Sequence, residues 1–256
     1  MLGWIARGLA QGQITTRYPK TPERPVGAFH GPLVVLDASG ADRELEWFCP
    51  TGAITVDSRR RITLDRGRCI QCGECVRAAP HRFAFAQRYE TAARHRQALI
   101  VGTRDDPEPG EDRPALAARA RPLRRSIHVR HIDTGSDGAE EWEIQALWNP
   151  YYDIQRLGFF LTAAPRHADI LLATGVVTPP MRAPLERTWE VMPEPKALVA
   201  VGTDACSGGL SAQDGSRFSG IDAVLPVDVY VPGSPPPPIA ILEGLLLAVG
   251  LLADST

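Results

Sequence analysis

The stretch RCIQCGECVRAAP, residues 68–80, contains three of the five cysteines of the chain, each separated from the next by two residues. An odd number of cysteines, three of them within seven residues, is not typical of a disulfide framework. Thiols at this short, fixed spacing are typical metal ligands in a reducing compartment. The stretch therefore predicts a metal-binding loop. Its cysteines are Cys69, Cys72 and Cys75; the others in the chain are Cys49 and Cys206.

The fourth ligand is predicted from a damaged copy of the same motif upstream. Bacterial ferredoxins with two clusters repeat the run C-x2-C-x2-C-x3-C-P, and the fourth cysteine of each run ligates the cluster of the other run. Cys49 stands before Pro50 as such a fourth cysteine would, whereas Ala79 stands before Pro80 in the second run. By the same spacing, the vacated positions of the other cluster are Ser39, Asp42, Leu45 and Ala79.

The two runs are damaged in complementary ways, which predicts one [4Fe–4S] cluster. Because fourth ligands are exchanged, Cys49 completes the set of the second run, while the other cluster has lost every ligand. Two alternatives stay open: a three-iron cluster that leaves Cys49 unused, or zinc, which more often takes two separated pairs of cysteines. Residues 52–65, GAITVDSRRRITLD, predict a β-hairpin between the two loops.

Length and composition are those of a globular protein with one or two domains. The chain has 256 residues, of which 44% are hydrophobic and 23% are charged. A net charge of -2 argues against a nucleic-acid-binding protein. The apolar stretches near residue 5 and at 239–252 are too short for a signal peptide or a membrane span, so we expect neither.

The second half of the chain alternates between strand and helix signals. Apolar runs at 126–133, 168–175, 196–202 and 223–233 predict strands, and 179–192 and the run from about 237 predict helices. Residues 149–162 predict a helix followed by extended chain. This alternation is typical of a parallel sheet with helices on its faces.

Composition divides the chain into four parts. Residues 1–30 are a short amphipathic helix and an extended stretch, which we expect to pack either on this chain or on a membrane-arm partner. Residues 31–100 form the cysteine-bearing domain, and 101–125, rich in proline, glycine and charge, form a linker. Residues 126–256 form the α/β domain.

The chain resembles two subunits of one kind of complex. Residues 1 to about 100, including ARGLAQGQITTRYP, resemble the ferredoxin-like iron–sulfur subunit of complex I and of energy-converting membrane-bound [NiFe] hydrogenases. Residues from about 126 to 252 resemble the small, cluster-carrying subunit of these complexes, through RRSIHVRHIDTGS, PEPKALVAVG, CSGG and LPVDVYVPGSPPPP. The resemblance implies a fusion, formate hydrogenlyase-like, of an α+β ferredoxin-like domain and an α/β flavodoxin-like domain.

The resemblance also implies the loss of a second cluster. The small subunit of this family holds a proximal [4Fe–4S] cluster with four cysteines, and their positions fall here on Asp137, Glu140, Asp204 and Ser234. Oxygen ligands do not suit iron–sulfur chemistry, although they can hold Mg²⁺ or Ca²⁺. The alternative is a collapsed polar pocket without a metal. Cys206, which stands alone, is interpreted as a small buried apolar residue.

The function implied is that of an iron–sulfur electron-transfer subunit, not itself catalytic, of an oxidoreductase complex at the cytoplasmic face of the inner membrane. The expected partners are a hydrogenase or complex I-like large subunit and membrane-arm subunits, and an external ferredoxin is a further candidate. No nucleic acid and no nucleotide is expected, since the glycine element at 207–209 lacks a phosphate-loop lysine. Two alternatives are a structural assembly subunit whose cluster only stabilises the fold, and a standalone electron carrier.

Overall fold

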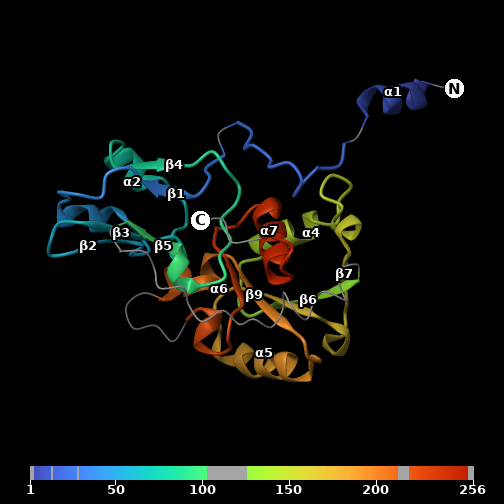
Figure 1. The fold of residues 1–256 in the computed structure, drawn as a ribbon. Coiled ribbons are helices and arrows are strands. Elements are labelled where there is room, and N and C mark those ends of the chain that lie inside the picture. Colours follow the sequence, from blue (N-terminus) through green and yellow to red (C-terminus); the bar gives the residue numbers. More distant parts are fainter. Residues whose placement is uncertain (1–2, 13, 28, 103–125, 213–218, 253–256) are drawn as a thin grey trace.

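The computed structural model describes residues 3–12, 14–27, 29–102, 126–212 and 219–252. Residues 29–102 are called the first unit below, and residues 126–252 the second unit. The two units lie side by side, and helix α1 (Gly3–Gln11) projects away from both (Figure 1). Most of the expected linker, residues 103–125, falls outside the described residues.

A five-stranded parallel sheet forms the centre of the second unit. Its strands run in the order β10-β9-β8-β6-β7. Val129 lies opposite Ile170 in the central pair, and every pairing is parallel. The α/β fold predicted for this half is thereby confirmed. The strands are β6 (Ile127–Asp133), β7 (Phe159–Leu161), β8 (Ile170–Thr174), β9 (Ala197–Val201) and β10 (Val229–Val231).

Helices cover both faces of this sheet, which explains why β8 and β9 are buried at every residue (Figure 1). Ile144 of α4 and all of α7 belong to the core on one face, and Leu185 of α5 and Cys206 of α6 belong to the core on the other. The helices are α4 (Ala139–Ala146), α5 (Pro179–Val191), α6 (Thr203–Ser207) and α7 (Pro238–Ala248).

Two small antiparallel sheets form the first unit. One pairs β1 (Leu33–Val35) with β4 (Phe83–Phe85), and the other has the order β2-β3-β5. The predicted hairpin is confirmed, since Ile54 of β2 lies opposite Leu64 of β3. The remaining elements are β2 (Ile54–Val56), β3 (Ile62–Asp65), β5 (Ile100–Gly102), α2 (Glu74–Ala78) and 3-10 turns at Arg43–Phe48 and Arg96–Leu99.

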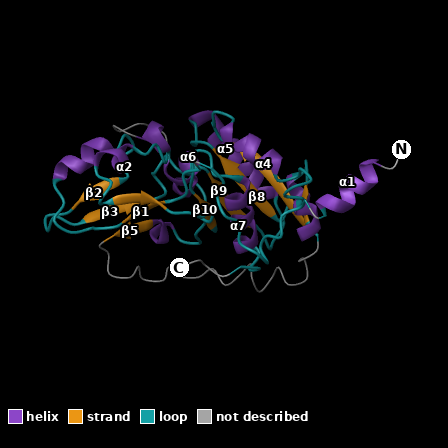
Figure 2. Cartoon of the chain, turned by 90° about the horizontal axis from the view of Figure 1, so that it is seen from above, coloured by secondary structure: helices purple, strands orange, loops and turns teal. Residues whose placement is uncertain are grey.

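Two segments of the chain pack against the second unit from outside its sheet. The Thr16 N–H donates to the Tyr151 carbonyl at 2.8 Å, and Arg156 donates back to the Thr16 carbonyl at 3.1 Å. Further along, Ala93 forms an antiparallel bridge with Tyr230, at the open edge of β10. The first unit therefore contacts the second at the edge of β10, and Figure 2 shows the two units from above.

The segment 149–162 differs from its prediction as a helix. It forms only a 3-10 turn at Ile154–Leu157, followed by the edge strand β7. Gly158 ends the turn with a φ of 90°, and the apolar residues that follow pair with β6. The predicted extended stretch is thus present, but a single 3-10 turn stands where a helix was predicted.

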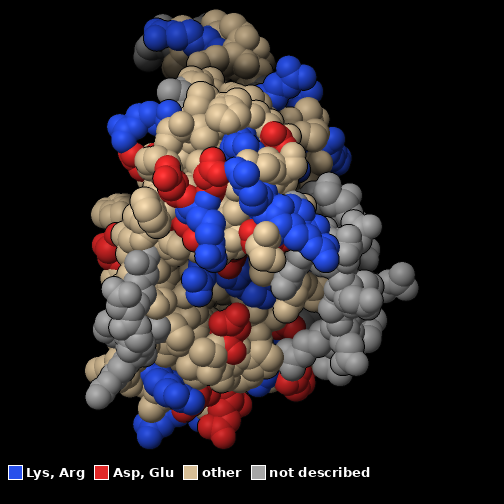
Figure 3. Space-filling view, turned by 90° about the vertical axis from the view of Figure 1, so that its left-hand side faces the viewer, with Lys and Arg blue, Asp and Glu red and all other residues tan. Residues whose placement is uncertain are grey.

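Positive and negative side chains are interspersed on the face that the first unit presents (Figure 3). Several of its arginines are paired there: Arg60 with Asp42, Arg77 with Glu74, and Arg82 with Asp37. Charge is thus neutralised locally over much of this face. No helix in the described part of the chain is long and apolar enough to cross a membrane.

Candidate metal centre

The four cysteines of the predicted set line one hollow in the first unit. Cys49 follows the 3-10 turn that ends at Phe48, whereas Cys69 and Cys72 lie in the loop after β3 and Cys75 lies in α2. Cys72 is exposed and Cys75 is buried, so the hollow extends from the surface into the core. Apolar side chains complete its walls: Leu33, Phe48, Ile54, Leu64 and Phe85. We call this space the cysteine hollow.

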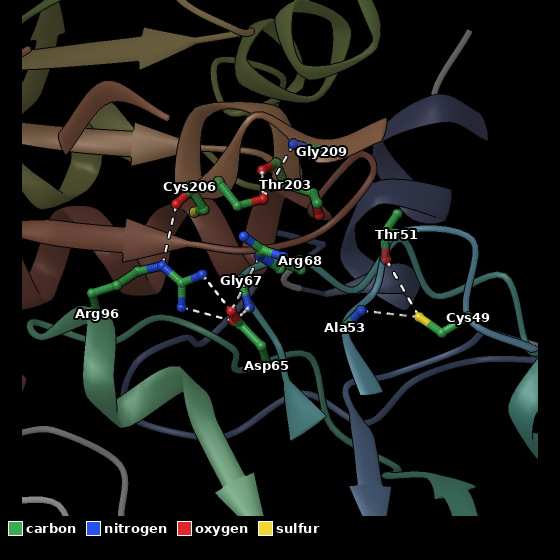
Figure 4. A network of polar contacts seen from close by, with 11 residues as sticks. Cys49, Thr51, Ala53, Asp65, Gly67, Arg68, Arg96, Thr203, Cys206 and Gly209 are labelled. Atoms are coloured by element: carbon green, nitrogen blue, oxygen red, sulfur yellow. Dashed lines mark hydrogen bonds and ion pairs between the residues drawn. The ribbon is translucent and has the colours of Figure 1, made fainter. Parts of the chain in front are cut away.

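Backbone amides point at several of the thiols. The Ala53 N–H donates to Cys49 Sγ at 3.1 Å, as Figure 4 shows. The amides of Gln71 and Val76 hydrogen-bond to the thiols of Cys69 and Cys75. Gln71 reaches its position by adopting a φ of 56°, which bends the loop between the first two cysteines. Amides aimed at sulfur stabilise thiolate ligands and tune the potential of a bound cluster.

Burial keeps two of the thiols protonated at neutral pH. It raises the pKa of Cys69 to about 12 and that of Cys75 to about 11, and the neighbouring thiols add to the effect while the amides oppose it. A metal must displace these protons to bind. Among the described residues, no group of three or more His, Cys, Asp or Glu side chains is gathered closely enough to hold a single metal ion. The four thiols nevertheless border one common hollow.

The four vacated positions of the other cluster carry residues with separate contacts. Ala79 is buried in the core of the first unit, and Leu45 packs against that core. Asp42 forms an ion pair with Arg60 on the surface. The N–H and hydroxyl of Ser39 both donate to Asp37 Oδ1, at 3.0 and 2.8 Å. Two of these residues are therefore part of the core or pack against it, and the other two form polar contacts with neighbouring residues.

The positions expected for the lost proximal cluster bring three carboxyl groups together in the second unit. Glu140 is only 5% exposed, and burial raises its pKa to about 7, with smaller contributions from Asp137, Asp204 and Glu141. Burial also raises the pKa of Asp204. Ser234, the fourth position, is exposed on the loop before α7.

Two of these carboxyl groups rest directly on glycines. A Cβ atom added to Gly202 would lie 2.5 Å from Glu140 Oε1, and one added to Gly209 would lie 1.8 Å from Asp204 Oδ1. Both contacts are closer than a side chain permits. The carboxyl groups therefore occupy space that the glycine backbone leaves open, as a collapsed polar pocket would.

Glu141, next to Glu140, makes its contacts within the chain. Its carboxylate accepts hydrogen bonds from the hydroxyls of Ser136 and Thr174, and it lies 3.3 Å from His131 Nε2. Burial lowers the pKa of His131, while Glu141 raises it. His131 thus has partners within the second unit, Glu141 and Thr174.

The sequence did not identify the residues that join the cysteine loop to the second unit. The Thr203 hydroxyl donates to the Cys69 carbonyl at 3.1 Å. Arg96 binds both oxygens of Asp65 at 2.7 Å and donates to the Cys206 carbonyl at 3.3 Å (Figure 4). The only available signal was position, since Thr203 precedes the vacated Asp204 and Asp65 precedes the cysteine loop.

Comparison with known proteins shows the family of the second unit. Residues 138–248 match the family described as NADH ubiquinone oxidoreductase, 20 Kd subunit. The chain is 44% identical over 131 residues to the probable membrane-bound hydrogenase subunit mbhJ of Pyrococcus furiosus, covering 50% of this chain and 77% of that protein. The chain therefore belongs to this family, and the resemblance of its second half to the small subunit is confirmed.

Other relatives are subunits of similar complexes. The chain is 42% identical over 136 residues to formate hydrogenlyase subunit 7 of Escherichia coli, and the match spans only 53% of the length of each protein. It is 46% identical over 104 residues to an NADH-quinone oxidoreductase subunit of Citrifermentans bemidjiense, covering 41% of this chain and 61% of that protein. A chain from the archaeal membrane-bound sulfane sulfur reductase superposes with a TM-score of 0.44 at 28% identity, over 51% of this chain and 72% of that one.

Proposed function

We propose that this chain is an electron-transfer subunit of a membrane-associated complex related to complex I and membrane-bound hydrogenases. In this proposal it carries one [4Fe–4S] cluster on Cys49, Cys69, Cys72 and Cys75. The observation that supports it best is that Cys49, far from the other three in sequence, lines the same hollow as they do. If Cys49 is the exchanged fourth ligand, it should lie beside the other three cysteines.

The chemistry of the hollow fits such a cluster. All four candidate donors are thiols, which iron–sulfur clusters require, and the amides of Ala53, Gln71 and Val76 point at sulfur. Apolar walls exclude water from the inner side, where Cys75 lies. When bound, a cluster of this kind supplies one-electron transfer. The residues of the chain bind it, orient it and limit its contact with solvent.

The second unit acts in this proposal as a docking module without a cluster. Its candidate ligand positions carry oxygen groups, and Glu140 and Asp204 occupy the space above Gly202 and Gly209. The names of the relatives support an assembly of the hydrogenase or complex I type. The partners proposed within it are a large subunit, membrane-arm subunits and an external ferredoxin. The chain then lies at the cytoplasmic face of the membrane, as a fusion of a ferredoxin-like domain (residues 31–100) with a small-subunit domain (126–256).

A second candidate function is structural. The cysteine hollow borders the core of the first unit, since Leu33, Ile54 and Leu64 belong to both. A cluster in the hollow would fill a void in a small domain and stabilise it without carrying electrons. Reduction of the cluster distinguishes the two functions.

The test is anaerobic purification of the full chain with measurement of iron, zinc and sulfide, followed by electron paramagnetic resonance after dithionite. We expect four irons per chain and a reduced-cluster signal. Cys49→Ser should lose the four-iron signal, whereas the matched control Cys206→Ala should keep it. A chain that contains zinc or no metal would overturn the cluster. A cluster that dithionite cannot reduce in the assembled complex would favour the structural role.

A further inference from the structure

Helix α6 of the second unit is attached at both ends to the segment that leads into the cysteine loop. At its start, the Thr203 hydroxyl donates to the Cys69 carbonyl at 3.1 Å. Near its end, the Cys206 carbonyl accepts Arg96 Nε at 3.3 Å. Arg96 in turn binds Asp65, which ends β3 four residues before Cys69. Figure 4 shows Arg96 reaching both Asp65 and the Cys206 carbonyl.

The turn between Asp65 and Cys69 is held closely by these contacts. Asp65 Oδ1 accepts the Gly67 N–H at 2.9 Å as well as Arg96 Nη1 at 2.7 Å. A Cβ atom on Gly67 would lie 2.7 Å from Arg96 Cζ, so the guanidinium packs directly on the turn. Arg96 therefore restricts the conformation of the turn at the start of the cysteine loop.

Thr203 is itself fixed by the backbone of the second unit. It is only 1% exposed, and its N–H donates to the Gly233 carbonyl at 2.7 Å. Its carbonyl accepts the Ser207 hydroxyl at 3.0 Å. Since a threonine hydroxyl has one hydrogen to donate, that hydrogen is committed to the Cys69 carbonyl. The Thr203 hydroxyl is therefore a fixed donor to the backbone carbonyl of Cys69, a candidate ligand.

We propose that Thr203 is a positioning residue of the metal centre, whose hydroxyl orients Cys69 toward the cysteine hollow. The inference rests on the proposed function and extends it to a residue of the other unit. Partners outside the ligand set orient metal ligands and tune the metal. The O–H donor also withdraws negative charge from the carbonyl of this ligand residue, which favours the reduced, more negative state of a cluster.

The test compares three variants of the full chain, each loaded anaerobically with its cluster. Thr203→Val replaces the hydroxyl by a methyl group, and Thr203→Ser keeps the hydroxyl. The control Thr178→Val makes the same replacement elsewhere in the second unit, at a hydroxyl that donates to the Thr134 carbonyl. The readouts are the midpoint potential, from a titration followed by electron paramagnetic resonance, and the rate of iron loss to a chelator. Thr203→Ala serves the same comparison if the valine variant does not fold.

We expect Thr203→Val to lower the midpoint potential and to lose iron roughly fivefold faster, as the loss of one hydrogen bond implies. Thr203→Ser and Thr178→Val should match the wild type in both readouts. If Thr203→Val also matches the wild type, or if Thr203→Ser behaves like the valine variant, the proposal is wrong. A wild-type chain without iron would overturn the proposed function as well, whereas an unchanged Thr203→Val in an iron-loaded chain would overturn this inference alone.

Discussion

The Glu243 carboxylate on α7 accepts the backbone N–H groups of Thr91 and Ala92 at 2.8 and 2.9 Å. Glu243 is 2% exposed in a helix that is otherwise apolar and entirely buried. A carboxylate in such a place is unfavourable unless it is hydrogen-bonded. The segment that it holds belongs to the first unit, and the next residue, Ala93, pairs with Tyr230 of the second unit. Glu243 therefore anchors this segment of the first unit on the second unit.

Replacing Glu243 should destabilise the protein strongly. Glu243→Leu leaves two buried N–H groups without this acceptor, so we expect a loss of about 2–5 kcal/mol in the free energy of unfolding. Glu243→Gln keeps a carbonyl oxygen and should lose less. Urea unfolding followed by circular dichroism measures both. Glu190→Gln, on the exposed side of α5, is the control and should change stability by less than about 0.5 kcal/mol. A Glu243→Leu chain as stable as the wild type would contradict this role.

Gly202 and Glu140 should show coupled effects, because the carboxyl group rests on the glycine. Ala at position 202 would take a φ of 97° and meet Glu140 Oε1, whereas Ala at Gly138, where φ is 92°, would meet nothing within 4 Å. We expect Gly138→Ala to cost about 1–2 kcal/mol from backbone strain, and Gly202→Ala to cost more. Adding Glu140→Ala to Gly202→Ala should recover part of the loss, as thermal unfolding will show. Strictly additive effects would mean that Glu140 does not fill this space.

Stability should fall between pH 5 and pH 8 because of Glu140. Burial raises its pKa to about 7 from an ordinary value of 4.5, so the folded state holds the proton more tightly than the unfolded state. The stabilisation is complete below pH 4.5 and is lost as the pH rises through 7. At pH 8 the buried charge opposes folding by up to about 3 kcal/mol.

Glu140→Gln should therefore be more stable than the wild type at pH 8 and should have a flatter pH dependence. Urea midpoints at pH 5 and pH 8 measure this difference. Asp204 retains a raised pKa of its own, so some slope will remain. A variant with the same slope as the wild type would show that Glu140 is ionised throughout this range.

The sequence predicted those parts of the molecule in which a local pattern determines the structure. The apolar runs of β8 and β9 and the alternating residues of the β2–β3 hairpin predicted strands that the structure contains. Cysteine spacing alone predicted that Cys49 lies close to the loop that begins at Cys69, twenty residues later. The Thr203–Cys69 and Glu243–Ala92 contacts join residues more than 130 positions apart. No periodicity in the sequence encodes such contacts, because they arise only when the two units pack together.

The Asp65–Arg96 pair should contribute far more to stability than the ion pairs on the surface. Its side chains are 19% and 18% exposed and meet through two hydrogen bonds of 2.7 Å. Removing one partner leaves the other charge poorly solvated, so Arg96→Met should cost about 2–4 kcal/mol. A double-mutant cycle with Asp65→Asn should give a coupling energy of about 1–3 kcal/mol.

The control for this cycle is Arg60 with Asp42, whose side chains are 60% and 74% exposed. Exposed pairs are screened by water and salt, so this coupling should stay below about 1 kcal/mol and shrink further in about 0.5 M salt. The coupling energy of the Asp65–Arg96 pair should change little with salt concentration. Equal couplings for the two pairs would mean that Arg96 does not hold the cysteine loop against α6, and the positioning proposed for Thr203 would then depend on the Thr203–Cys69 hydrogen bond alone.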